Sequence, residues 1–284
     1  MSFFQEIVHK FSVAGIDSPL LETREIFAFV QHKHPAEIYS NCEVDESEKL
    51  RILELVEKRL QHFPLDKILG KKGFYKNEFI TNENVLSPRP DTEILVEEAL
   101  KLLPADSKTS ILDLGTGSGC IIESILKERP DMTGTAVDIS VQALQTAEQN
   151  AVSLGISQRL NFINSDWFSP NFLNFFSRQF EIIVTNPPYI PLSEIKKLEP
   201  EVKEHDPMLA LNGGESGFDC YRKIAELTPF LLKENGYIFI ESGIGQAQEI
   251  ADIFCACGLS LYKIAPDLAG IERCVILQKK VAQL

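Results

Sequence analysis

Hydrophobic residues fall into two different patterns along the 284-residue chain. In the first 70 residues they recur three or four positions apart, as in FFQEIVHKFSVAG and ESEKLRILELVEKRLQH, which predicts amphipathic helices. Ser18-Pro19 is typical of a helix start, and Asp45 with Glu48 predicts a capping box. We therefore expect a small all-α domain of three or four helices over residues 1–70.

Residues 71–88 change character, because aromatic residues and Ile alternate with polar residues around Lys76-Asn77. This alternation predicts a β-hairpin, and we place the linker between two domains in this segment. After Pro88-Arg89-Pro90, Asp91 is expected to cap the helix TEILVEEALKLL.

From residue 109 onward, short apolar runs alternate with amphipathic stretches. The runs predicted to be strands are SILDLG, MTGTAVDI, RLNFINSD, FEIIVTN, YIFIES, LSLYKI and ERCVILQKK. Intervening helices, one of them over residues 218–236, imply right-handed βαβ crossovers and a mostly parallel sheet. The last two strands have no helix between them, so one should pair antiparallel at an edge. The predicted fold class is α/β, with a Rossmann-like domain over residues 89–284.

Composition narrows the classes of function. The chain is 44% hydrophobic and 24% charged, which is ordinary for a globular protein, and no run of 18 apolar residues or secretory signal is evident. Its six cysteines lack metal-ligand spacing, so we expect reduced thiols, no metal and a cytoplasmic location. A net charge of −13 is poorly suited to a nucleic-acid partner, although Lys71, Lys72 and Lys76 form either a local basic patch or a solvated turn.

A glycine-rich loop follows the first predicted strand of the sheet and opens a helix. Its residues are Gly115, Thr116, Gly117, Ser118 and Gly119, preceded by Asp113. Such a loop is either a tight structural turn or a place where a ligand approaches the main chain closely. Asp138, at the end of the next strand, favours the ligand, because a carboxylate there can accept hydrogen bonds from both ribose hydroxyls of an adenosine.

The spacing of the loop, Gly-x-Gly-x-Gly, differs from that of dinucleotide sites. The charge of Asp113 would repel a pyrophosphate but suits a cofactor with an ammonium and a sulfonium group, such as S-adenosylmethionine. Asp166-Trp167 follows the third strand. This pair is either an acceptor for the adenine amine with a ring against the adenine face, or a helix cap with a buried aromatic residue.

The turn Asn186-Pro187-Pro188-Tyr189 ends the fourth strand at the carboxyl edge of the predicted sheet, where ligands bind in this fold class. Its prolines fix φ and remove N–H donors, which leaves the Asn186 side-chain oxygen and the Pro187 carbonyl as a stiff pair of acceptors. These suit the two hydrogens of a planar –NH2 group, with the Tyr189 ring against its flat face. Holding both hydrogens returns electron density to the nitrogen and aims it at an electrophilic methyl group, so Asn186 and Pro187 are the candidate catalytic residues.

The chain resembles the bacterial peptide chain release factor glutamine methyltransferases over residues 64–280. The resemblance is carried by VLSPRPDTEILVE, ILDLGTGSGCI, SDWF, NPPYIP and LALNGGESGFDCYRKI, whereas FYKNEF lacks a glycine common after Phe-Tyr in that family. It implies an S-adenosylmethionine-dependent enzyme that methylates the glutamine of the Gly-Gly-Gln loop of class I release factors, with the helical domain docking the factor.

The resemblance also implies roles for individual residues. Gly115–Gly119 and Asp138 would hold the methionine and ribose portions of the cofactor, and Asp166 and Trp167 would contact adenine. Asn186 and Pro187 would bind the glutamine amide, Asn186 also facing the cofactor. Pro188 and Tyr189 would shape the pocket, which Pro88 and Arg89 would line. The enzyme would act as a monomer in translation termination, and residues 193–217 have the position typical of a lid.

Two other readings stay open. The same turn serves DNA or RNA amino-methyltransferases that act on a flipped base, whose target amine is also planar. A binding module that keeps the cofactor fold without activity is the non-enzymatic alternative.

Overall fold

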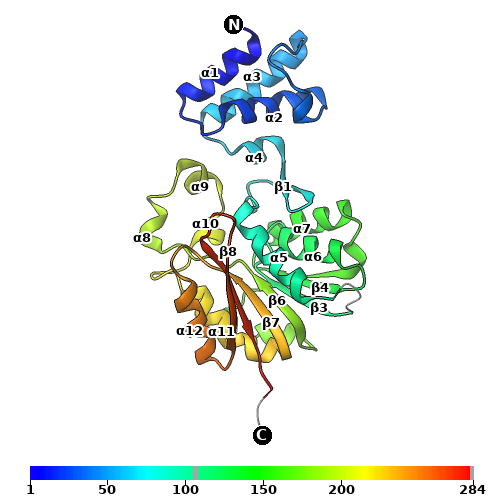
Figure 1. The fold of residues 1–284 in the computed structure, drawn as a ribbon, viewed down its shortest axis with the longest axis vertical. Helices are drawn as coiled ribbons and strands as arrows, with labels where there is room; N and C mark the ends of the chain where they lie inside the picture. The colour runs from blue at the N-terminus through cyan, green and yellow to red at the C-terminus, as the bar shows by residue number, and fades with distance from the viewer. Residues whose placement is uncertain (105–107, 282–284) are drawn as a thin grey trace. The chain divides into compact units, whose positions relative to one another are not determined.

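The computed structural model describes residues 1–104 and 108–281, and the chain forms two compact units (Figure 1). The helical unit comprises Met1–Lys71 together with Pro200–His205, and the sheet unit comprises Lys72–Glu199 and Asp206–Leu284. Each unit has its own hydrophobic core. Within the described residues, no helix is both long and apolar enough to cross a bilayer.

The helical unit is an assembly of short amphipathic helices. They are α1 (Phe3–Val13), α2 (Pro19–Gln31), η1 (Pro35–Glu37), α3 (Glu46–Leu60), α4 (Leu65–Leu69) and α9 (Pro200–His205). The predicted capping box is confirmed: Asp45 accepts from the Glu48 backbone N–H, and the Glu48 carboxylate accepts from the Asp45 N–H. The core contains large side chains from three helices, including Phe11, Phe27 and Leu55.

The sheet unit contains a hairpin and a seven-stranded sheet. The hairpin strands are β1 (Lys71–Phe74) and β2 (Asn77–Ile80), which confirms the turn predicted around Lys76. The sheet strands are β3 (Ser110–Leu114), β4 (Thr133–Asp138), β5 (Leu160–Asn164), β6 (Phe180–Thr185), β7 (Leu232–Glu241), β8 (Ser260–Pro266) and β9 (Glu272–Gln278). Their order is β5-β4-β3-β6-β7-β9-β8, with β9 antiparallel to both neighbours.

Two layers of helices cover the sheet (Figure 1). The helices of the sheet unit, most of which belong to these layers, are η2 (Pro90–Thr92), α5 (Glu93–Leu102), α6 (Cys120–Glu128), α7 (Val141–Ser153), η3 (Ser157–Arg159), η4 (Phe172–Phe175), α8 (Leu192–Ile195), α10 (Met208–Leu211), α11 (Asp219–Leu231) and α12 (Ala247–Ala256). Helices α5 and α6 share one buried cluster with Ile182 and Val184 of β6, whereas α11 and α12 share another with Ile183. The apolar run of β6 is continuous because successive side chains point to opposite faces and both faces are buried.

The predicted antiparallel pairing at an edge is confirmed, since the edge strand β8 pairs antiparallel with β9. Two details differ from the sequence predictions. The helix expected over residues 218–236 ends at Leu231, because Leu232 already pairs with Phe180 of β6. Asp91 does not cap α5, since its carboxylate accepts a hydrogen bond from Arg273 at 2.9 Å.

Candidate active site

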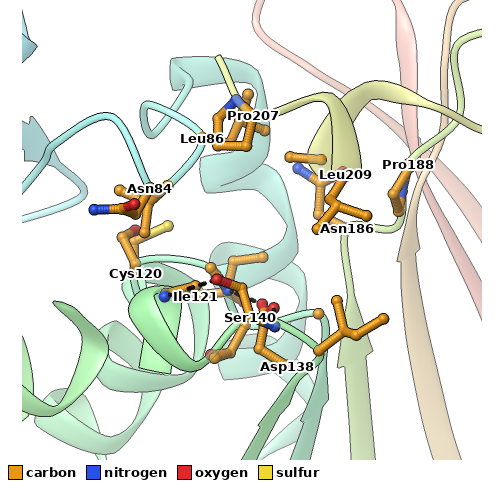
Figure 2. A pocket seen from close by; sticks show the side chains of 18 of the residues that line it. Asn84, Leu86, Cys120, Ile121, Asp138, Ser140, Asn186, Pro188, Pro207 and Leu209 are labelled. Carbon is orange, nitrogen blue, oxygen red and sulfur yellow. Dashed lines mark hydrogen bonds between the residues drawn. The ribbon is translucent and has the colours of Figure 1, made fainter. Parts of the chain in front are cut away.

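A cavity of about 270 Å³ lies in the sheet unit, at the carboxyl ends of β3, β4, β5 and β6. Figure 2 shows side chains from the carboxyl ends of different strands converging on it, with Asp138 at the end of β4, Ser140 just after it, and Asn186 and Pro188 after β6. The candidate residues that line it are Gly115, Thr116, Gly117, Ser118, Asp138, Asp166, Trp167, Asn186 and Pro188, together with Pro88 and Arg89. Gly119, Pro187 and Tyr189 are absent from the lining. The structure therefore brings the cofactor motifs and the Asn-Pro-Pro-Tyr turn to one cavity.

The glycine loop is held in a shape that requires glycine. Gly115, Gly117 and Gly119 have φ values of 78°, 55° and 83°, in the left-handed region that L side chains disfavour. A Cβ on Gly115 would lie 3.2 Å from the Trp167 ring, so this glycine lets the indole cover the loop. The Gly117 N–H donates to the Asp138 carboxylate at 2.9 Å, which joins the loop to the end of β4.

Asp113, at the start of the loop, is fully buried. Its Oδ2 accepts from the Thr116 hydroxyl at 2.8 Å, and its Oδ1 makes no hydrogen bond to a described residue. Burial raises the pKa of Asp113 to about 7, an effect that the Thr116 hydrogen bond opposes and the nearby Asp138 reinforces. The carboxyl group is thus partly protonated near neutral pH, and a cation placed beside it would favour its ionised form.

The Asn-Pro-Pro-Tyr turn begins where β6 leaves the sheet. The Thr185 hydroxyl donates to the Leu114 carbonyl at 2.7 Å, which aligns the start of this turn with the start of the glycine loop on β3. Asn186 is partly buried, and Pro187 is buried. The rigid turn therefore presents Asn186 to the cavity from a fixed point on the sheet.

Tyr189 is partly buried and does not line the cavity. A Cβ on Gly213 would lie 2.7 Å from the Tyr189 main chain, and one on Gly217 would lie 2.6 Å from the Tyr189 carbonyl oxygen. One on Gly243 would lie 3.0 Å from the Tyr189 ring. Burial raises the pKa of Tyr189 to about 12, with Glu241 adding to the rise, so the phenol stays neutral.

Two further segments line the cavity, and the first of them was not predicted from the sequence. Residues 84–87 come from the loop after β2, and Pro207, Leu209, Ala210 and Asn212 come from the segment around α10. The Ile190 N–H donates to the Leu211 carbonyl at 3.1 Å, which holds this second segment beside the Asn-Pro-Pro-Tyr turn. This second segment lies within residues 193–217, which the sequence predicts to have the position of a lid, and its action as a lid stays a prediction.

Comparison with known proteins follows the same division of the chain. The family model of the PrmC N-terminal domain matches residues 3–70, and that of the methyltransferase small domain matches residues 78–201. The release factor glutamine methyltransferase of Rhodospirillum rubrum is 38% identical over 275 residues, which is 96% of this chain and 83% of that protein. The chain belongs to the release factor glutamine methyltransferase family.

Other comparisons agree with this family assignment. The release factor glutamine methyltransferase of Thermodesulfovibrio yellowstonii is 39% identical over 278 residues, covering 97% of this chain and 96% of that protein. A methyltransferase from Pyrococcus furiosus, 14% identical, matches 84% of this chain and 100% of its own with a TM-score of 0.51 and so shares the fold. The predicted family, fold class and methyltransferase activity are confirmed, whereas the roles of individual site residues stay predictions.

Proposed function

We propose that this protein transfers a methyl group from S-adenosylmethionine to the side-chain amide nitrogen of the glutamine in the Gly-Gly-Gln motif of class I release factors. The observation that carries the proposal is the single cavity lined by both the glycine loop with Asp138 and the Asn-Pro-Pro-Tyr turn. Names of relatives that act on release factors support the choice of substrate.

The residues of the cavity fit the proposed cofactor. The Asp138 carboxylate, anchored by the backbone N–H groups of Gly117 and Ser140, keeps lone pairs for ribose hydroxyls. Trp167 and Asp166 supply an aromatic face and an acceptor for adenine. Asp113 does not line the cavity, but its Oδ1, which makes no hydrogen bond to a described residue, is a buried acceptor at the start of the glycine loop whose charge favours a cationic ligand nearby. When bound, S-adenosylmethionine supplies an electrophilic methyl group on a sulfonium.

In the proposed mechanism, the residues of the turn act on the substrate amide. The Asn186 Oδ1 and the Pro187 carbonyl accept the two N–H hydrogens, which orients the nitrogen lone pair toward the methyl carbon. Bound S-adenosylmethionine would supply the methyl group to the nitrogen that Asn186 and Pro187 hold, and one N–H proton would leave for water. Preorganised acceptors cost no reorganisation during the reaction, which is why no charged nucleophile is needed.

We assign docking of the release factor to the helical unit. Its surface exposes several large apolar side chains, namely Val13, Leu20, Leu21 and Leu50. A contiguous apolar patch formed by some of these side chains would suit a protein–protein interface.

The proposal is tested by incubating the protein and methyl-labelled S-adenosylmethionine with an intact class I release factor, with the same factor lacking the motif glutamine, and with duplex DNA. We expect label only on the intact factor. Label on the DNA would support the nucleic-acid alternative, and no label on the intact factor would refute the proposal.

A variant tests the role of Asn186. We expect Asn186→Ala to lower kcat by about 10²–10³, because one preorganised hydrogen-bonding partner of the reacting group is lost. Calorimetry should show unchanged cofactor affinity. Asn171→Ala, an exposed asparagine outside the cavity, is the matched control. Wild-type turnover in Asn186→Ala would remove this residue from the mechanism.

A further inference from the structure

The role assigned to Asn186 depends on which end of its side-chain amide faces the cavity. The Oδ1 atom can accept a hydrogen bond from the substrate –NH2 group, whereas the Nδ2 atom can only donate and would meet another donor. The two ends have nearly the same size, so the orientation is decided by the partner on the side away from the cavity.

Glu241 occupies that side. In the parallel register of β6 and β7, Thr185 aligns with Ile240, so Asn186 and Glu241 follow at the ends of neighbouring strands. Glu241 is only 3% exposed and does not line the cavity. Its carboxyl group interacts with the side chains of Asn186 and Thr92, and the Tyr221 hydroxyl donates to its main-chain carbonyl at 2.9 Å.

The surroundings of Glu241 do not explain it as a structural ion pair. Its Oε2 makes no hydrogen bond to a described residue, and neither does the Thr92 hydroxyl that faces it, so the two interact without hydrogen-bond geometry. Arg273, whose charge lowers the pKa of Glu241, donates its hydrogen bonds to Asp91 and Asp267 instead. A buried carboxyl group with so few partners destabilises a fold, which points to a role in function.

We propose that Glu241 is a positioning residue that fixes the orientation of the Asn186 amide. This inference rests on the proposed function of Asn186. An ionised carboxylate accepts hydrogen bonds and cannot donate them, so only the Nδ2 end of Asn186 can face it. The Oδ1 end then faces the cavity as the acceptor for the substrate amide. A protonated Glu241 can donate to Oδ1 and would favour the reverse, unproductive orientation.

The titration of Glu241 gives this device a pH dependence. Burial raises the pKa of Glu241 to about 7, the Thr92 and Asn186 side chains and Arg273 oppose the rise, and Asp91 adds to it. Tyr189 and Tyr221 also face the group, but burial raises the pKa of each phenol, so both stay neutral. With saturating cofactor and release factor, kcat should therefore fall as the pH drops through about 7.

A reciprocal exchange of the two side chains provides the sharpest test. Glu241→Gln can present either end of its own amide to Asn186, so we expect kcat to fall by about 10–100-fold and to lose its acid limb. Asn186→Asp places two carboxyl groups side by side, and its kcat should fall at least as far as that of Glu241→Gln. In the double variant Asn186→Asp with Glu241→Gln, the –NH2 end of the new glutamine donates to one oxygen of the new aspartate, and the other oxygen of that aspartate faces the cavity. We expect at least about tenfold recovery over Asn186→Asp alone.

The control is Glu98→Gln, which also neutralises a buried glutamate but faces Lys101 and Lys263 away from the cavity. It should lower stability without changing the pH profile of kcat. If the paired exchange is no better than Asn186→Asp, or if Glu241→Gln keeps the wild-type acid limb, the proposal is wrong.

A second measurement separates this inference from the proposed function. The wild-type reaction with intact release factor reports on the function. Selective ¹⁵N labelling of asparagine side chains reports on Glu241 without any substrate, and the Asn186 –NH2 signal is identified by its loss in Asn186→Asp. That signal should titrate near pH 7 in the wild type and not in Glu241→Gln. A wild-type signal that stays constant from pH 5.5 to 8.5 would overturn the inference whatever the activity.

Discussion

Gly213 packs against the main chain of Tyr189 in the Asn-Pro-Pro-Tyr turn, and replacing it tests how precisely that turn must be placed. A Cβ at Gly213 would lie 2.7 Å from both the Cα and the carbonyl carbon of Tyr189, where ordinary contact begins at 3.4 Å. Both are main-chain atoms of a turn that contains two prolines, so neither can swing aside as a flexible side chain would. In Gly213→Ala, the turn and the Gly213 segment must separate by about 0.7 Å.

The magnitude of the effect follows from that displacement. A misplacement of 1 Å near reacting groups can cost about 10²-fold in rate, so about 0.7 Å should lower kcat by roughly 20-fold. Overpacking of this kind should also lower the free energy of unfolding by about 1–3 kcal/mol. Cofactor affinity should change little, because the glycine loop and Asp138 belong to other strands.

The assay compares kcat at saturating cofactor and release factor, cofactor affinity by calorimetry, and Tm. Gly73→Ala is the matched control, because no atom lies within 4 Å of its added Cβ and its φ is not positive. It should leave both kcat and Tm near their wild-type values. The reasoning is refuted if Gly213→Ala keeps wild-type kcat, or if it loses activity only through weaker cofactor binding.

Two further predictions concern Asp113 and Arg59. Because the pKa of Asp113 is raised by burial, its folded form keeps a proton that the unfolded chain releases, so stability without cofactor should fall as pH rises from about 4 to 7. Asp113→Asn should flatten this fall in Tm, and an unchanged profile would contradict it. Arg59 is only 3% exposed and pairs with Glu22 and Glu201. Arg59→Ala should therefore destabilise the helical unit. Because the Glu201 side chain is 36% exposed and keeps part of its hydration, we expect the low end of the loss typical of a broken buried pair, about 3 kcal/mol. Hydrogen exchange should rise in α1–α3 and α9 but not in the exposed-pair control Arg51→Ala, and equal exchange in both would contradict it.

Features set by neighbouring residues were accessible from sequence. The strands of the sheet, the glycine loop and the capping box at Asp45 each depend on residues a few positions apart, and the structure confirms them. Asp138 was found because its place at the end of the second predicted strand is a topological rule of the fold. The same rule put Asn186 at the edge where the cavity lies.

Features set by distant residues were not accessible. The cavity wall around Pro207 depends on pairs such as Arg89 with Asp206, which hydrogen-bond at 3.0 Å although 117 positions separate them. Burial is equally non-local, so the sequence presented Asp113 as a full negative charge when its raised pKa makes it partly neutral. The importance of Glu241 had no local signal, because it reads as the last residue of an ordinary strand.

The division of the chain into two units has a consequence for cutting it apart. Residues 200–205 follow the Asn-Pro-Pro-Tyr turn in sequence, yet they belong to the compact body formed by Met1–Lys71. There the His205 ring packs tilted against that of Phe63, with ring centroids 4.6 Å apart, and the Lys67 ammonium donates to the His205 carbonyl. A fragment beginning at Lys72 would keep residues 200–205 but lose Phe63 and Lys67, which contact them. A cut between the two units in the sequence therefore does not give a catalytic fragment that folds by itself, and we expect the two units to fold together.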